Sequence, residues 1–137
     1  MGLDIAHTFA RSGHAVVVRE ISDELAEKSH SRLVAALDKL VARGKMDEAK
    51  RAEILGNMTF TTDLAAAADA DLVLEAIVEN LDVKKSLFQE LDGICKADTI
   101  FATNTSSISI TAIAAATQRA DRFIGMHFFN PATVMKL

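Results

Sequence analysis

Three short apolar runs, separated by longer stretches with helical spacing, limit the folds open to this chain. The runs are AVVVRE at 15–20, DLVLEAI at 71–77 and TIFAT at 99–103. Apolar side chains at consecutive positions are typical of a strand buried on both faces, as in a parallel sheet covered by helices. Because strand and helix alternate along the whole chain, we expect an α/β fold with a doubly wound parallel sheet.

Apolar spacing, capping residues and glycines predict the remaining elements. The expected helices cover 2–12, 22–42, 47–55, a short alanine-rich segment after Asp63, 82–95 and 109–117. Two further strands are expected at 58–62 and 122–128. The helices on either side of Gly44 form a helical hairpin that follows the strand at 15–20.

The composition indicates one globular domain and argues against a nucleic-acid-binding surface. A chain of 137 residues, of which 50% are apolar and 25% charged, can bury a core of ordinary size. The formal net charge is −4, and the chain has no Trp, no Tyr and no basic run. A surface that binds nucleic acid through its phosphates needs the opposite charge balance.

Cysteine usage and hydropathy point to a reducing compartment. Cys95 is the only cysteine, which excludes a disulfide framework and a cysteine-based metal site. No apolar stretch is long enough to cross a membrane, and the N-terminus lacks the pattern of a signal peptide. We therefore expect a cytoplasmic protein that does not bind a membrane, and we predict no metal ligand.

Polar side chains with catalytic chemistry follow the last two predicted strands. Ser106 and Ser107 come just after TIFAT, and His127 lies in the last apolar run, directly before the Asn130-Pro131 pair. Parallel-sheet proteins bind ligands at the carboxyl ends of their strands. A histidine among apolar neighbours is partly desolvated and titrates near neutrality, which suits a general base. Taken alone, these residues fit a buried structural histidine and a helix-capping serine at least as well.

The N-terminal part has the pattern of half a dinucleotide-binding unit. Met1-Gly2 opens a helix that leads to a strand ending at Glu20, 18 positions after Gly2. An acid at this point accepts hydrogen bonds from the adenosine ribose hydroxyls and repels a 2′-phosphate, so NAD is favoured over NADP. The neighbouring Arg19 would oppose this preference. A solvated acid at a strand end remains the alternative for Glu20.

Five segments together resemble the NAD-binding domain of the 3-hydroxyacyl-CoA dehydrogenases, in particular the 3-hydroxybutyryl-CoA dehydrogenase branch. They are Met1-Gly2, SGHAVVVRE at 12–20, DLVLEAIVENLDVKKSLF at 71–88, NTSSISIT at 104–111 and GMHFFNPATVMKL at 125–137. They cover nearly the whole chain in the family's order and spacing. The last three are specific to the family, and the resemblance implies a Rossmann-type fold.

The resemblance implies roles for the two polar motifs. His127 would take the proton from the substrate 3-hydroxyl while hydride leaves C3 for the nicotinamide. Ser106 would hydrogen-bond the reacting oxygen close to the nicotinamide, and so would contact both substrate and cofactor. Asn104 and Ser107 would hold the turn between them.

Further cofactor contacts are implied by the same resemblance. Besides Gly2, Glu20 and Ser106, they fall on Ala76, Glu79, Lys84 and Asn130. Pro131 would fix the turn after the last strand. The alternative for Glu79 and Lys84 is a helix-start acid with a solvated lysine five residues later.

The resemblance places the phosphates of an acyl-CoA substrate at the helical hairpin. An acidic protein must meet these phosphates with local positive charge, which Arg43 and Lys45 would supply around Gly44. Arg43 stands where the family has lysine, and Ala36 stands where it has a serine that contacts CoA. A solvated helix end is the alternative for Arg43 and Lys45.

Compared with the family, the chain corresponds to a partial NAD-binding domain over 1–137. The first strand with its Gly-x-Gly-x-x-Gly turn, the acid two positions after MKL that orients the histidine, and the C-terminal helical domain that makes a homodimer are all absent. The absent strand is the central one in the order 3-2-1-4-5-6. Its loss removes about ten ladder hydrogen bonds at ~1 kcal/mol each, so we expect low stability and little or no activity from this chain alone.

Two functional hypotheses follow. In the first, the longer parent protein uses NAD to oxidise a short-chain (3S)-3-hydroxyacyl-CoA, such as 3-hydroxybutyryl-CoA, to the 3-oxoacyl-CoA. In the second, the chain is a non-catalytic fragment that binds NAD or CoA, or a structural relative of the same fold. A sugar or phosphogluconate dehydrogenase of related fold gains no support from NTSS or HFFNP.

Overall fold

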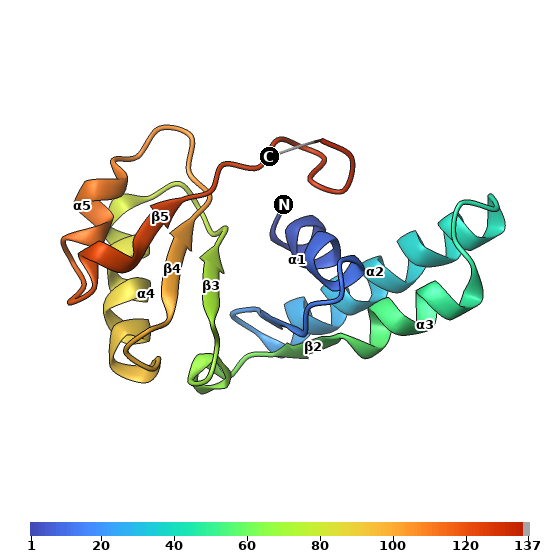
Figure 1. Ribbon diagram of the computed structural model, residues 1–137, viewed down its shortest axis with the longest axis horizontal. Coiled ribbons are helices and arrows are strands. Elements are labelled where there is room, and N and C mark those ends of the chain that lie inside the picture. The colour runs from blue at the N-terminus through green and yellow to red at the C-terminus, as the bar shows by residue number, and fades with distance from the viewer. Residues whose placement is uncertain (136–137) are drawn as a thin grey trace. The chain divides into compact units, whose positions relative to one another are not determined.

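Five short parallel strands form two separate sheets in the computed structural model, which describes residues 1–135 (Figure 1). One sheet has the order β1-β2 and the other the order β3-β4-β5. The chain accordingly divides into two units. The first unit consists of Met1 and Leu3–Asp63, and the second consists of Gly2 and the residues from Leu64 onward. The expected order 3-2-1-4-5-6, without strand 1, leaves one group of two neighbouring strands and one group of three, which are the two sheets observed. The expected fold class is therefore confirmed.

The first unit contains a two-stranded sheet and a helical hairpin. Its elements are α1 (Gly2–Arg11, of which Gly2 belongs to the second unit), β1 (Val16–Arg19), α2 (Asp23–Ala42), α3 (Glu48–Gly56) and β2 (Met58–Thr61). The parallel register pairs Val16 with Met58 and Arg19 with Thr61. The hairpin α2–α3 follows β1, as the sequence predicts (Figure 1).

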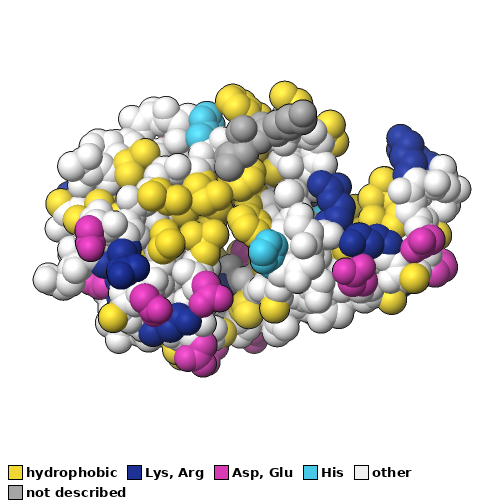
Figure 2. Space-filling model, viewed as in Figure 1, with side chains coloured by type: hydrophobic (Ala, Val, Ile, Leu, Met, Phe, Trp, Pro, Cys, Tyr) yellow, Lys and Arg dark blue, Asp and Glu magenta, His cyan; other side chains and the backbone are white. Residues whose placement is uncertain are grey.

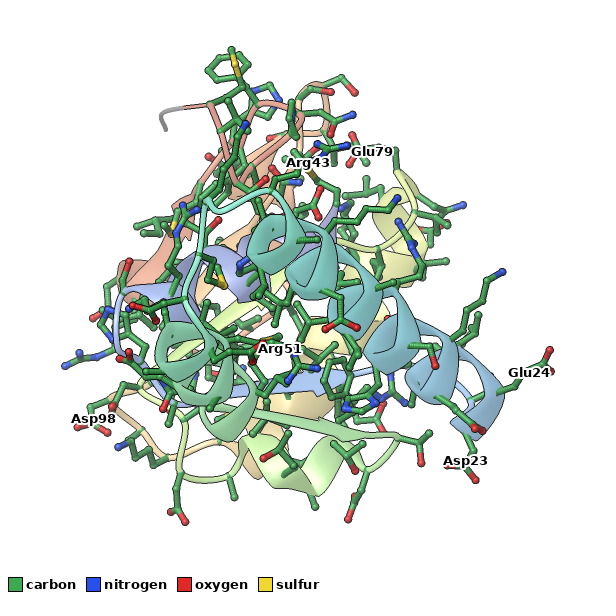
Figure 3. The ribbon with its side chains drawn as sticks, turned by 90° about the vertical axis from the view of Figure 1, so that its right-hand side faces the viewer. Asp23, Glu24, Arg43, Arg51, Glu79 and Asp98 are labelled. Atoms are coloured by element: carbon green, nitrogen blue, oxygen red, sulfur yellow. The ribbon has the colours of Figure 1, made fainter. Side chains whose placement is uncertain are left out.

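Side-chain caps and one glycine define the hairpin. The Ser22 hydroxyl accepts a hydrogen bond from the Leu25 amide at 3.2 Å, and the Asp47 carboxylate accepts one from the Lys50 amide at 2.7 Å. Gly44 follows α2 with a φ of +68°, which favours glycine. Arg51 on α3 (labelled in Figure 3) forms an ion pair with Asp38 on α2 at 2.8 Å. The predicted bounds of α2 and α3 are therefore correct to within one residue.

Strand β1 is less buried than its apolar run predicts. Val16 and Val18 pack against the core of the first unit, but Val17 is 49% exposed. Successive side chains of a strand point to opposite faces, so only the face of β1 toward the hairpin helices is covered within this unit. The prediction of a strand buried on both faces is wrong for 15–20.

The second unit holds a three-stranded sheet packed on helices. Its elements are η1 (Leu64–Ala67), β3 (Leu72–Glu75), α4 (Leu81–Ile94), β4 (Ile100–Thr103), α5 (Ile110–Ala114), η2 (Ala120–Arg122) and β5 (Phe123–Gly125). Phe88 of α4, Phe101 of β4 and Phe123 of β5 form its aromatic core, with ring centroids 4.7–6.3 Å apart. Figure 2 shows hydrophobic side chains gathered over the strands of this unit on the face toward the viewer.

A buried arginine closes the end of α4. The Arg119 guanidinium forms an ion pair with Asp92 at 2.6 Å and donates to the carbonyls of Lys96 and Thr99. Its central carbon lies 4.5 Å from the centroid of the Phe101 ring. The guanidinium also donates to the carbonyls of Asp92 and Cys95, which lie at the C-terminal end of α4, where carbonyl groups lack a partner inside the helix.

Three predicted elements differ from the observed ones. The alanine-rich segment forms a short 3-10 turn, Leu64–Ala67, and not an α-helix. Helix α5 ends at Ala114 rather than at Thr117. Strand β5 ends at Gly125, because its partner β4 ends at Thr103 opposite it, so His127 lies beyond the strand and not inside it. Lys136 and Leu137, the last residues of the GMHFFNPATVMKL motif, lie outside the described residues.

No helix within residues 1–135 combines the length and the apolar character that a membrane crossing requires.

The buried imidazole of His7 on α1 makes the stability of the chain depend on pH. His7 is 5% exposed, and its Nε2 has no hydrogen-bond partner in the described part of the chain. Burial, with the nearby charge of Arg11, lowers the pKa of His7. The unfolded chain therefore binds the proton first, so this contribution to stability is present above about pH 6.5 and is lost as the pH falls below it.

We expect His7→Gln to flatten the loss of stability between about pH 6.5 and 5, as urea denaturation at a series of pH values would measure. The matched control is His14→Gln, because His14 is exposed. An unchanged pH profile in His7→Gln would contradict this assignment.

Candidate active site

The carboxyl end of β1 presents a carboxylate that a neighbouring helix holds. Glu20 follows β1, and its amide donates to the Thr61 carbonyl at 2.9 Å. The Ser29 hydroxyl on α2 donates to Glu20 Oε1 at 2.8 Å. The carboxylate is thus fixed at the sheet edge, where it can accept hydrogen bonds from a ligand's hydroxyl groups. The sequence did not predict this role of Ser29, because a serine nine residues after Glu20 belongs to no recognisable motif.

The cation beside this carboxylate has its own partner. Arg19 Nε donates to the Thr62 carbonyl at 3.1 Å, across from β1 at the end of β2. This bond holds the guanidinium toward the β2 strand end. The expected opposition of Arg19 to an NAD preference stays a prediction.

The hairpin residues predicted to meet phosphates lie on an exposed turn. Arg43 caps the C-terminal end of α2 (Figure 3), and Lys45 follows Gly44. Both side chains are exposed, and Ala36 lies exposed on the same helix. Two exposed cations at a helix turn can bind an anion, although they also fit a solvated helix end. Their contact with CoA stays a prediction.

The register of the second sheet brings three loops to one edge. Glu75 pairs with Thr103, and Thr103 pairs with Gly125, and these residues are the last of β3, β4 and β5. Because the strands are parallel, the segments 76–80, 104–109 and 126–131 all leave the sheet at its carboxyl edge. These segments carry most of the predicted catalytic and cofactor-binding residues.

A buried ion pair lies directly under this edge. The carboxylate of Glu75 accepts hydrogen bonds from Lys84 Nζ at 2.6 Å, from the Thr103 hydroxyl at 2.5 Å and from the Ile77 amide at 2.7 Å. The side chains of Glu75 and Lys84 are both 0% exposed. The sequence did carry a signal for Glu75, since an acid inside an apolar strand run needs a buried partner.

The same lysine reaches the predicted cofactor residue Glu79. Lys84 Nζ lies 3.2 Å from Glu79 Oε1. Lys84 is therefore enclosed by two carboxylates, and the alternative of a solvated lysine is wrong. A direct cofactor contact by Lys84 stays a prediction.

Glu79 ties the loop after β4 to the loop after β3. Its Oε2 accepts hydrogen bonds from the Thr105 hydroxyl at 2.8 Å and from the Ser107 hydroxyl at 3.4 Å. The Thr105 bond, aided by Lys84, lowers the pKa of the Glu79 carboxyl against the opposing effect of desolvation. Ser106 lies between these two residues, and its side chain is exposed. The hydroxyl of Ser106 is thus presented outward from a loop that is held on both sides.

Two backbone amides hold the histidine segment to the end of β4 and to the residue that follows it. The Met126 amide donates to the Thr103 carbonyl at 3.0 Å, and the Phe128 amide donates to Asn104 Oδ1 at 2.9 Å. His127 lies between these two anchors. Its ring is exposed and lies 5.2 Å from the Phe129 ring, centroid to centroid. The expectation of a partly desolvated histidine is wrong, because Phe128 takes the buried position and His127 points away from it.

The remaining cofactor candidates lie at the ends of the second unit. Within this unit Gly2 and Ala76 approach closely, since a Cβ added to Gly2 would lie 3.6 Å from the Ala76 Cβ. Asn130 is exposed and precedes Pro131 through a cis peptide bond. The Pro131 carbonyl accepts from the Met135 amide at 2.9 Å, which forms the turn that the sequence expects there. Whether these residues contact a cofactor stays a prediction.

Among residues 1–135, no group of three or more His, Cys, Asp or Glu side chains is arranged to hold a metal ion.

The family model of the 3-hydroxyacyl-CoA dehydrogenase NAD binding domain matches residues 1–137. The chain belongs to this family. The resemblance seen in the sequence motifs is confirmed, and so is NAD as the cofactor of the domain.

Known members of the family share its sequence and fold. A 3-hydroxybutyryl-CoA dehydrogenase of Clostridioides difficile is 48% identical over the whole chain, which covers 49% of that relative. The human mitochondrial hydroxyacyl-coenzyme A dehydrogenase is 46% identical, and the chain covers 46% of it. The crystal structure of (S)-3-hydroxybutyryl-CoA dehydrogenase from Ralstonia eutropha matches all of the chain with a TM-score of 0.96 and 44% identity, over 48% of its own length. The chain thus spans about half the length of these dehydrogenases.

In this dehydrogenase domain, Asn104 connects the two polar motifs. We expect Asn104→Ala to destabilise the chain by roughly 1–2 kcal/mol, because the partly buried Phe128 amide would lose its acceptor. Asn104→Asp keeps an acceptor oxygen and is the matched control. Urea denaturation measures the difference, and equal stability of the alanine and aspartate variants would contradict the tether.

Proposed function

We propose that this chain is the NAD-binding part of an enzyme that oxidises (3S)-3-hydroxyacyl-CoA to 3-oxoacyl-CoA, with short-chain substrates such as 3-hydroxybutyryl-CoA. The observation that carries the proposal is the tether between the NTSS and HFFNP segments. The Phe128 amide bonds Asn104 Oδ1 at 2.9 Å, so the segments of Ser106 and His127 are held together at the carboxyl edge of one parallel sheet.

His127 serves as the general base in this proposal. The imidazole is exposed and lies between two backbone anchors, so one ring nitrogen is available to a bound hydroxyl group. A neutral imidazole accepts the hydroxyl proton as the carbon becomes a carbonyl. Phe129 lies beside the ring and limits its orientations.

Ser106 orients the reacting oxygen. Its exposed hydroxyl lies on a loop that Glu79 holds through Thr105 and Ser107. A hydroxyl in this position donates a hydrogen bond to the substrate oxygen and keeps it within reach of the base.

The described residues fit an NAD cofactor. The Glu20 carboxylate, fixed by Ser29, would accept hydrogen bonds from the adenosine ribose. Near the nicotinamide the candidates are Ser106, Glu79 and Asn130. Gly2 and Ala76, which lie close to each other, are further candidates for cofactor contact. When bound, NAD supplies the hydride acceptor.

The acyl-CoA phosphates would meet Arg43 and Lys45 on the exposed turn of the hairpin. A protein of net charge −4 needs such a local cationic site to bind a polyanionic substrate. We further propose that the enzyme is a homodimer through a C-terminal helical domain. A cytoplasmic location is supported by a single buried, unpaired cysteine, Cys95.

We expect His127→Ala to lower kcat by 10²–10⁴-fold, the usual effect of losing a general base. The assay is NADH formation from 3-hydroxybutyryl-CoA by a version of the protein extended to the length of its relatives. His14→Ala, which removes an exposed imidazole of the first unit, is the matched control. Activity of His127→Ala within about 10-fold of the parent would remove the base assignment. NAD binding without turnover by the parent would support a non-catalytic role.

We expect Glu20→Gln to shift the preference from NAD toward NADP by roughly 10-fold, or about 1.4 kcal/mol, because the charge that repels a 2′-phosphate is lost. Calorimetric titration with both cofactors measures the ratio of their dissociation constants. Glu27→Gln changes an exposed acid on α2 by the same one charge and should leave the ratio unaltered. An unaltered ratio in Glu20→Gln would show that another group selects the cofactor.

A further inference from the structure

We propose that Glu75 is a positioning residue, whose buried carboxylate acts through Lys84 and Glu79 to hold the loop that carries Ser106. The role of Ser106 in catalysis rests on the proposed function. The hydrogen-bond path from Glu75 to the loop does not, and it lies wholly within the second unit.

The path begins with the Glu75 carboxylate, which accepts hydrogen bonds from three donors. Lys84, the Thr103 hydroxyl and the Ile77 amide lie 2.5–2.7 Å from its two oxygens. These donors come from α4, from the end of β4 and from the loop after β3. The carboxylate therefore joins three elements at the point where the chain leaves the sheet. The Asn104 amide also donates to the Glu75 carbonyl, at 2.9 Å.

The second step is the lysine. Lys84 lies in the first turn of α4, where its side chain has no exposure to solvent. A buried ammonium is tolerated when carboxylates surround it, and here Glu75 and Glu79 lie at 2.6 and 3.2 Å. Glu75 thus holds the Lys84 ammonium group in a position from which it also reaches Glu79.

The third step reaches the loop. Glu79 is 43% exposed, so it would be free to adopt many rotamers without a partner. Its Oε1 is held by Lys84, while its Oε2 accepts from Thr105 and Ser107. The Thr105 hydroxyl in turn accepts from the Ile108 amide at 3.2 Å. The residues on both sides of Ser106 are fixed in this way.

Stability alone does not require this arrangement. A buried ion pair contributes little net stability compared with apolar side chains of similar volume, and replacing both partners is often neutral. The Phe88, Phe101 and Phe123 cluster already supplies an apolar core for the same unit. What the ion pair adds is a defined position for an exposed carboxylate and for the loop bonded to it.

The test compares two double variants of this chain by NMR relaxation. Glu75→Gln with Lys84→Met removes both buried charges and cuts the path to Glu79. Asp71→Asn with Lys96→Met removes an exposed ion pair of 2.9 Å from the same unit and is the matched control. We expect backbone order parameters at 105–108 to fall from about 0.85 to below about 0.6 in the first variant only.

Unchanged order parameters at 105–108 in a folded Glu75→Gln, Lys84→Met variant would overturn the proposal. If that variant fails to fold, Thr105→Val tests the same path at its last step. This substitution removes the hydroxyl that bonds Glu79, keeps a side chain of similar size and leaves the Glu75–Lys84 ion pair intact. Loosening of the loop in Thr105→Val supports the proposal, and an unchanged loop overturns it.

Steady-state kinetics of the Glu75→Gln, Lys84→Met variant, made in the version extended to the length of its relatives, distinguishes a positioning role of this pair from direct contact with the cofactor. Loss of loop order should lower kcat by roughly 10-fold or more, since misplacing a reacting group by about 1 Å can cost 10²-fold. A change confined to the KM for NAD would assign Lys84 to direct cofactor binding and overturn the positioning role. Because the NMR readout needs neither cofactor nor turnover, it remains valid if the proposed activity is wrong.

Discussion

The candidate site depends on the parallel register of β3, β4 and β5. Glu75, Thr103 and Gly125 end their strands side by side, so three loops leave the sheet at one edge. No local signal in any one loop could bring these loops together, because the hydrogen bonds that align them join strands far apart in the sequence. Once aligned, the loops can be joined by single bonds, such as the one from the Phe128 amide to Asn104.

The second unit combines an apolar core with a buried polar network, and the two have different roles. Aromatic packing among Phe88, Phe101 and Phe123 removes apolar surface from water without fixing any loop. The network of Glu75, Lys84 and Thr103 is directional, so each donor must lie within a narrow range of positions. We propose that the second kind of interaction positions the loop that carries Ser106, a role that apolar side chains in the same place could not fill.

The first unit holds its predicted cofactor residue, Glu20, by a similar directional contact. Glu20 is the end of a strand, and Ser29 of the next helix holds its carboxylate in one place. Arg19 is directed to a backbone carbonyl at the end of β2. An acid held at a strand end favours a ligand with free hydroxyl groups over one with an extra phosphate.

Most of the fold could be predicted from local sequence signals. The caps at Ser22 and Asp47, the turn at Gly44 and the apolar runs located the helices and strands to within a few residues. The errors arose where tertiary partners decide the outcome. Val17 is exposed because one face of β1 has no cover within its unit, and β5 stops at Gly125 because β4 ends opposite it.

By itself, the sequence determined the α/β class, the order of the elements and the family, because caps, apolar periodicity and the motifs NTSS and HFFNP are properties of neighbouring residues. Only the tertiary structure decided that Lys84 is buried between two carboxylates, that Asn104 receives the Phe128 amide and that His127 is exposed. These contacts join residues between five and 24 positions apart in the sequence. Their geometry depends on how strands and helices pack, which no single segment specifies.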